Sequence, residues 1–172
     1  HQADVIIYGT GFEVGTELVA RTGFETVGRG GLTLTEAWKD GMRSKHGIHV
    51  HGFPNAFWVQ PTQGANLISN VPHNIVESAM TIAMVIRHAL DGGHQTVEVT
   101  EQAQKDWVDL LMTGPGMMLG SADCTPGYYN NEGQPMSPAA QYNRGYPAGA
   151  AAYFKYIKAW RESGDFDGLE FA

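Results

Sequence analysis

The chain of 172 residues has little cysteine, little positive charge and no long hydrophobic run. Its single cysteine, Cys124, excludes an internal disulfide and is typical of a reducing compartment. Eleven basic against eighteen acidic side chains give a net charge of −7, which argues against nucleic acid as a partner, because phosphate binding needs clustered positive charge. No apolar run approaches the roughly 20 residues of a membrane span, and no signal peptide is visible. We therefore expect a cytoplasmic protein without a membrane partner.

An apolar segment stands almost at the first residue. Residues 3–8 (ADVIIY) are typical of a core strand, yet almost no surface segment precedes them. With 42% apolar and 17% charged residues the composition is that of a globular protein. The chain is therefore expected to be part of a longer protein whose N-terminal region supplies the neighbours of this strand.

Periodicity predicts the α/β class, with at least three helices packed on a small sheet. The clearest helix follows Asn70 and ends at Gly92, with an apolar stripe that includes Ile75, Ile82 and Leu90. Further predicted elements are strands at residues 5–8, 56–59 and 96–99, a small hairpin at 24–34, a helix capped by Thr100, an ordered wrapping segment at 113–147, a helix at 147–162 and a last strand within 166–171.

Three patterns could indicate chemistry, and each favours a structural interpretation. Gly9 and Gly11 follow a predicted strand, but the third glycine of a dinucleotide fingerprint, Gly15, is one position late, and no strand that ends in an acidic residue follows about 20 residues further on, as the motif requires. The histidines at 46, 49 and 51 resemble a metal cluster, and His49 and His51 would share one face of a strand, but no third or fourth ligand is convincingly placed, so we expect core or polar histidines near a turn and no metal site. Cys124 lacks a paired histidine and is expected to be a small apolar residue.

The polar loop at residues 60–70 leads into the N-terminus of the long helix. Helix N-termini present free N–H groups and partial positive charge, and they receive anions or electron-rich oxygens. A merely well-capped helix would show the same residues. The sequence leaves both interpretations open.

Several segments resemble one family, in the same order along the chain. Residues 4–12 (DVIIYGTGF) are similar to the D-x-I/V-I/V-x-A-T-G-F/Y strand of flavoprotein monooxygenases that use FAD and NADPH. Further matches are residues 28–38 (GRGGLTLTEAW), 52–57 (GFPNAF), 69–70 (SN) and 125–135 (TPGYYNNEGQP), the last of which resembles a Baeyer–Villiger subgroup. Together they are spread in family order from residue 4 to residue 135.

This resemblance implies a fold and a reaction. Residues 1–12 would be the strand and linker that return from the NADP domain, with Gly9, Thr10 and Gly11 in the linker. Residues 13–172 would be the C-terminal portion of the FAD-binding domain. The family reduces FAD with NADPH, forms a flavin C4a-peroxide with O2, and inserts one oxygen atom next to a ketone carbonyl to give an ester or lactone.

The resemblance also assigns site residues. Ser69, Asn70 and Val71 would bind the flavin, with the Val71 N–H near a flavin carbonyl. Leu67 would lie on the substrate side of the flavin. Cys124 or Thr125 stands where some relatives place a tryptophan against the nicotinamide. We therefore do not expect this chain to make the same aromatic contact with the nicotinamide.

The chain also departs from the family pattern. Gly9 replaces the usual alanine, and the two glycine-rich dinucleotide loops and the family's catalytic arginine do not occur in this sequence. We therefore expect the chain alone to carry no catalytic residue, to bind no cofactor, to be inactive and to self-associate. The alternatives are an N- or S-oxygenating flavin monooxygenase, a non-catalytic piece whose main property is self-association, and an independent nucleotide-binding or hydrolytic enzyme.

Overall fold

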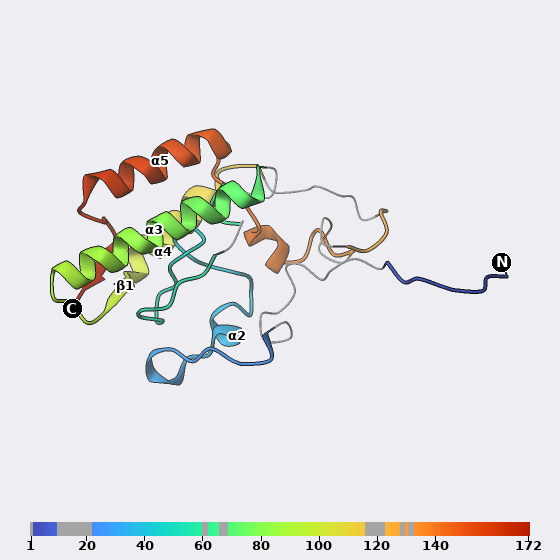
Figure 1. Ribbon diagram of the computed structural model, residues 1–172, viewed down its shortest axis with the longest axis horizontal. Coiled ribbons are helices and arrows are strands. Elements are labelled where there is room, and N and C mark those ends of the chain that lie inside the picture. The colour runs from blue at the N-terminus through green and yellow to red at the C-terminus, as the bar shows by residue number, and fades with distance from the viewer. Residues whose placement is uncertain are drawn as a thin grey trace.

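The computed structural model describes residues 2–9, 22–59, 62–65, 69–115, 123–127, 130 and 133–172. Within these residues the chain forms a small α/β structure in which helices pack around a two-stranded sheet (Figure 1). The elements in chain order are the 3-10 helix η1 (Arg29–Gly31), α2 (Leu34–Ala37), α3 (Val71–Asp91), β1 (Val97–Val99), α4 (Glu101–Met112), the 3-10 helix η3 (Ala139–Tyr142), α5 (Ala150–Ser163) and β2 (Leu169–Phe171).

The sheet pairs β1 with the end of the chain. β1 and β2 are antiparallel, with Val97 opposite Phe171 and Val99 opposite Leu169. Asn55 occupies the other edge of β1: its backbone N–H donates to the Val97 carbonyl, and its side-chain oxygen accepts from the Val97 N–H, both at 2.9 Å. A single residue in a turn, through its backbone N–H and its side chain, thus satisfies backbone groups that a third strand would otherwise pair. The predicted strands at 96–99 and 166–171 are confirmed.

The main core is aromatic and lies between α3, α4, α5 and the loops before α3. It includes Trp107, Tyr153, Ile157, Trp160 and Phe166, all nearly inaccessible. The Trp107 indole N–H donates to the Gln63 carbonyl at 2.9 Å, which satisfies its polar atom inside the core. A second small cluster joins Leu34, Val50, Phe53 and Trp58. The helices predicted after Thr100 and before Gly164 are confirmed, with these aromatics on their buried faces.

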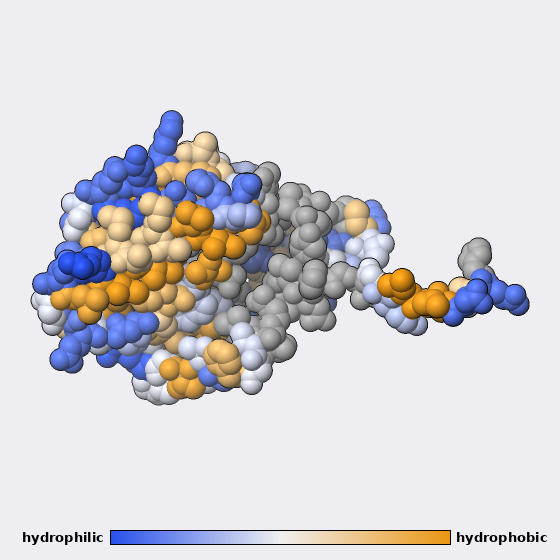
Figure 2. Space-filling view, in the orientation of Figure 1, coloured by the Kyte–Doolittle hydropathy of each residue, from blue (hydrophilic) through white to orange (hydrophobic). Residues whose placement is uncertain are grey.

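Helix α3 is confirmed, but it does not bury its apolar stripe. Most of the predicted stripe is exposed, with Ile75 at 49%, Ile86 at 40% and Leu90 at 69% of their maximal surface, whereas Ile82 is partly buried. The buried face is instead formed by the mostly small or polar side chains Asn74, Ser78, Thr81, Val85 and Ala89. This face packs on α5, which lies beside α3 in Figure 1. Figure 2 shows apolar surface gathered along α3 on the viewed side.

Two predicted strands are wrong. Residues 5–8 form no strand and are exposed, Ile7 at 89%, and the described N-terminal residues extend away from the helices (Figure 1). A strand needs a hydrogen-bonding partner, and no described segment pairs with these residues. Residues 56–59 bury Trp58 but form no strand. Their two described backbone hydrogen bonds run from the Ala56 N–H to the Phe53 carbonyl at 3.3 Å and from the Trp58 N–H to the Ile48 carbonyl at 2.9 Å, and these do not form a ladder with one partner segment.

The predicted hairpin forms only one bridge, and the predicted wrapping segment is seen packed on the core at one end. In the hairpin, one antiparallel bridge joins Val27 to Thr33 around η1. In the wrapping segment, Tyr146 stacks on Trp107 at 5.7 Å, and Arg144 donates to the Gly114 carbonyl at 2.6 Å. This end of the segment is therefore ordered against the core, whereas residues 116–122 lie outside the described residues.

Candidate functional site

The N-terminus of α3 is the candidate site that the sequence predicts. The Asn70 side-chain oxygen accepts from the His73 N–H at 3.0 Å, and Pro72 has no N–H to satisfy. Within the described residues the Val71 N–H has no hydrogen-bond partner. The first turn carries no acidic side chain. This terminus therefore presents one free N–H and the positive end of a helix of 21 residues, which fits an electron-rich oxygen.

Side-chain contacts of Ser69, His73 and the buried Asn74 fix this terminus in place. The Ser69 hydroxyl bonds the side-chain oxygen of buried Asn74 at 3.0 Å. The His73 ring lies edge-on to Phe154 of α5, with ring centroids 4.4 Å apart. The terminus is thereby held by α5, while Val71 itself stays 37% exposed. The geometry is that of a rigid wall with an open face.

The other predicted site residues are not assembled with this terminus by any described bond. Gly9 lies in the exposed N-terminal segment, and Thr10, Gly11 and Leu67 lie outside the described residues. Cys124 and Thr125 are exposed, and their carbonyls accept from the side chain of buried Asn130 at 3.2 and 3.3 Å. The Asn130 side-chain amide therefore holds the backbone of this loop through two hydrogen bonds.

Two of the three histidines are core residues, as the sequence predicted. His46 is surrounded by Trp107 and Trp160, with ring centroids 4.6 and 4.8 Å away, and His49 packs on Phe57. Burial, reinforced by the nearby Lys45 charge, lowers the pKa of His49 to about 3 and that of His46 well below its ordinary value. Over the described ranges no three His, Cys, Asp or Glu side chains are grouped to hold a metal.

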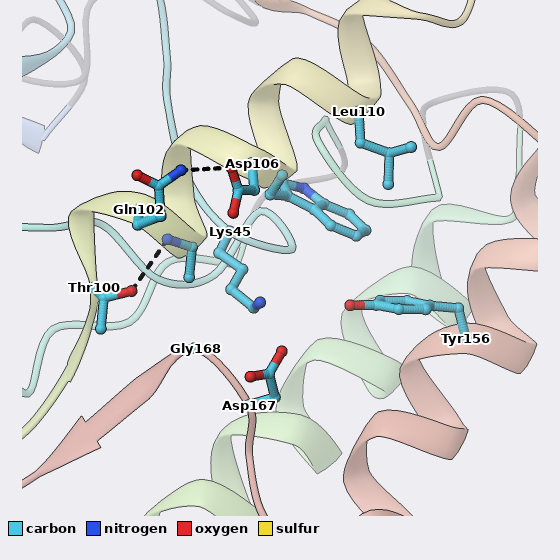
Figure 3. A pocket seen from close by; sticks show the side chains of 10 residues that line it. Lys45, Thr100, Gln102, Asp106, Leu110, Tyr156, Asp167 and Gly168 are labelled. Carbon is cyan, nitrogen blue, oxygen red and sulfur yellow. Dashed lines mark hydrogen bonds between the residues drawn. The ribbon is translucent and has the colours of Figure 1, made fainter.

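A second hollow, which the sequence did not indicate, opens between α4, α5 and the loop before β2. It is a cavity of about 380 Å³ whose polar lining groups include Lys45, Asp106, Tyr156 and Asp167 (Figure 3). The amine of Lys45 points toward Tyr156 and Asp167 in this view. Lys45 occurs in a polar stretch that reads as a surface loop. No local pattern in the sequence shows that it is 6% exposed.

None of the described helices is both long enough and apolar enough to span a membrane. Comparisons with known proteins point to one family. The chain is 40% identical over 171 residues to the FAD-binding monooxygenase hmp7 of Hypomyces subiculosus, a match that covers 99% of this chain and 28% of that protein. It is 38% identical over 176 residues to the Baeyer-Villiger monooxygenase peniC of Penicillium patulum, with coverage of 99% and 28%.

A solved structure agrees with these sequence matches. The polycyclic ketone monooxygenase from the fungus Thermothelomyces thermophila superimposes with a TM-score of 0.74 at 30% identity, over 92% of this chain and 26% of that one. No protein-family model matches the chain. The chain thus spans a little more than a quarter of the length of the proteins that it matches.

Proposed function

Because this chain is a partial homologue of Baeyer–Villiger and FAD-binding monooxygenases, we propose that it forms one wall of a flavin site. The proposed enzyme uses FAD and NADPH to insert one oxygen atom of O2 next to a ketone carbonyl, which gives an ester or lactone. The observation that carries the assignment is the α3 N-terminus, where a free Val71 N–H stands on an exposed, rigidly held helix end.

The residues at this terminus suit the proposed task. Val71 would donate to a flavin carbonyl, and the positive end of α3 would stabilise negative charge on the ring system. Ser69 and Asn70 fix the direction of that N–H through their bonds to Asn74 and His73. The bound flavin would supply the redox chemistry, which no side chain can provide.

The remaining parts of the assignment follow the resemblance. Residues 1–12 would form the strand and linker from the NADP domain, and residues 13–172 the end of the FAD-binding domain. Leu67, Cys124 and Thr125 would lie on the substrate and nicotinamide side. The chain alone is proposed to be inactive, since it carries neither glycine-rich dinucleotide loop.

Removing the Val71 N–H tests the flavin assignment in the complete monooxygenase. Proline is well tolerated at the first helical position, and Asn70 already has the extended backbone that a following proline requires, with φ −62° and ψ 111°. Val71→Pro should therefore weaken FAD binding by about 3- to 10-fold, the usual contribution of one hydrogen bond, as measured by flavin fluorescence. Val71→Ala keeps the N–H and is the matched control. Equal affinities for the two variants would contradict the assignment.

The substrate class is tested by the same enzyme's consumption of NADPH. Ketones should stimulate NADPH oxidation with formation of an ester or lactone. Stimulation by amines or thioethers alone would instead support an N- or S-oxygenating relative.

A second candidate function is self-association of the chain itself. The apolar face of α3, formed by Ile75, Val76, Met80, Ile86 and Leu90, is 40–69% exposed at each of these residues. Monomeric proteins rarely leave a contiguous apolar surface of this kind uncovered. A second copy of the chain is the proposed occupant when no larger partner is present.

A further inference from the structure

The cavity beside α4 contains a lysine in an unusual setting. Lys45 is 6% exposed, and within the described part of the chain its ammonium group forms no hydrogen bond or ion pair. Among the described residues, its Nζ atom is not one of the fully buried polar atoms that lack a partner, so the amine itself is open to the cavity. An amine that is held by a largely buried side chain and is open to a cavity of about 380 Å³ is placed to meet a ligand or reactant that enters there.

The backbone beside the lysine leaves room for its amine. Gly168 has φ +86°, and a Cβ atom at this position would lie 2.7 Å from the Lys45 Nζ atom and 2.6 Å from the Ala103 Cβ atom. No larger residue fits without displacing the amine. The positive φ of Gly168 and its contact with Ala103 both require glycine here, and the loop backbone thereby lies against the end of the Lys45 side chain.

Tyr156 supplies a proton at the same cavity. Its hydroxyl lies 3.1 Å from the Nε2 atom of His46, whose Nδ1 atom is buried without a partner. An unsatisfied N–H is rarer in proteins than an unsatisfied acceptor, so the favoured tautomer carries its hydrogen on Nε2. His46 then donates to the Tyr156 oxygen, which leaves the Tyr156 hydrogen free to point into the cavity.

The charged groups around the amine act in opposite directions. Burial lowers the pKa of Lys45, whereas the carboxylates of Asp106 and Asp167 raise it. Burial has the larger effect, and the buried His46 and His49 stay neutral beside it. The burial of Tyr156 raises its pKa to about 12, so that its hydroxyl keeps its proton. The cavity thus combines an amine with a larger neutral fraction and a proton donor.

We propose that Lys45 is a reactive amine that condenses with small aldehydes entering this cavity. The neutral Nζ attacks the carbonyl carbon and forms a C–N bond, while Tyr156 delivers a proton to the carbonyl oxygen. One nitrogen proton then returns to the Tyr156 oxygen, and the new hydroxyl group leaves as water with the second nitrogen proton, which gives the C=N bond. One amine and one aldehyde give one imine and one water, with no oxidant or reductant. The site is independent of the proposed flavin function.

Reductive trapping tests this proposal on the chain itself. Propanal with cyanoborohydride at pH 7 converts each imine into a stable propylamine, and peptide mass spectrometry reads the rate at each lysine. The exposed lysines 39, 105, 155 and 158 are internal controls in the same molecule. Lys45 should react at least about fivefold faster than these, because nucleophilic catalysis by lysine depends on the neutral amine. A Lys45 rate equal to or below theirs would overturn the proposal.

Two further measurements show whether the reactivity of Lys45 comes from the folded cavity or from its neighbours in the sequence. In denaturing guanidinium the advantage of Lys45 should vanish, and its persistence there would overturn the proposal. Tyr156→Phe keeps the ring and removes the hydroxyl, so it should slow Lys45 several-fold and leave the exposed lysines unchanged. An unchanged Lys45 rate in this variant would overturn the role of Tyr156.

Discussion

His46 and His49 are the residues in which burial and ionisation conflict most directly. Both are nearly inaccessible, at 1% and 3% of their maximal surface, and both have a ring nitrogen without a partner. The pKa of His49 is about 3 in the folded chain, against about 6.5 when exposed. The folded structure therefore holds both rings neutral, whereas the unfolded chain protonates them in weak acid.

This difference predicts an acid-sensitive fold. Below pH 6.5 the unfolded chain binds more protons than the folded chain, so the free energy of unfolding falls as the pH falls. The loss continues down to the folded pKa, about 3 for His49, and it disappears above pH 6.5. Each histidine contributes at most about 1.4 kcal/mol per pH unit in this window. Urea denaturation at pH 7.5 and pH 5.0 measures the slope.

A His49→Phe variant separates the contribution of one ring. It preserves an aromatic ring against Phe57 and removes the buried nitrogens. The decrease in the free energy of unfolding between pH 7.5 and pH 5.0 should therefore be smaller, by at most the contribution of one histidine. Equal losses in the variant and the natural chain would show that His49 takes up protons alike in the folded and unfolded states.

At the scale of elements, the seam between α3 and α5 is held by a buried ion pair. Arg161 of α5 is 4% exposed and lies 2.7 Å from the Glu77 carboxylate of α3. It also donates to the Glu77 carbonyl and the Thr81 hydroxyl at 3.1 and 3.0 Å. These bonds explain how a mostly polar helix face can be the buried one.

Breaking this pair should weaken the fold strongly. Arg161→Ala leaves the Glu77 carboxylate largely buried without its cation, a change that typically costs about 3–5 kcal/mol. Lys158→Ala is the matched control on the same helix, since Lys158 forms an exposed pair with Glu162 at 3.7 Å and should cost less than about 1 kcal/mol. Urea denaturation at pH 7.5 compares the two. Similar losses would mean that the seam does not depend on the ion pair.

The helices were predictable from the sequence, but the direction that α3 faces was not. Caps such as Asn70 and Thr100 act within one turn, so local sequence suffices to find where α3 and α4 begin. The face that packs depends on what lies opposite, and Arg161 is 84 residues from Glu77 along the chain. The strand predicted at residues 5–8 was wrong for a related reason: strand formation depends on a pairing segment, and no described segment pairs with these residues.

The α3 terminus could be predicted from the sequence, whereas the cavity around Lys45 could not. The α3 terminus was found because a polar loop, a cap and a helix are contiguous in the sequence. The cavity around Lys45 was missed because its lining comes from the loop at residue 45, from α4, from α5 and from the loop before β2. Only the folded chain brings Lys45, Tyr156 and Gly168 together.

For the whole molecule, the apolar face of α3 sets two opposing tendencies. Burying side chains such as Ile86 and Leu90 favours association, at roughly 25 cal/mol for each Å² of apolar surface removed from water. The net charge of −7 opposes it by repulsion between copies. Salt screens the repulsion and leaves the apolar contribution, so the balance should shift toward assemblies as ionic strength rises.

We therefore expect dimers or larger assemblies that strengthen with added salt in sedimentation velocity. Ile86→Lys places a charge on the apolar face and, because a symmetric interface contains each substituted residue twice, should weaken association at least about tenfold. Asp91→Asn makes the same change in net charge on the same helix without charging the apolar face, and it should not weaken association. A chain that stays monomeric at high concentration and high salt would contradict the prediction. Equal weakening by both variants would mean that net charge, and not the apolar face of α3, decides whether the copies meet.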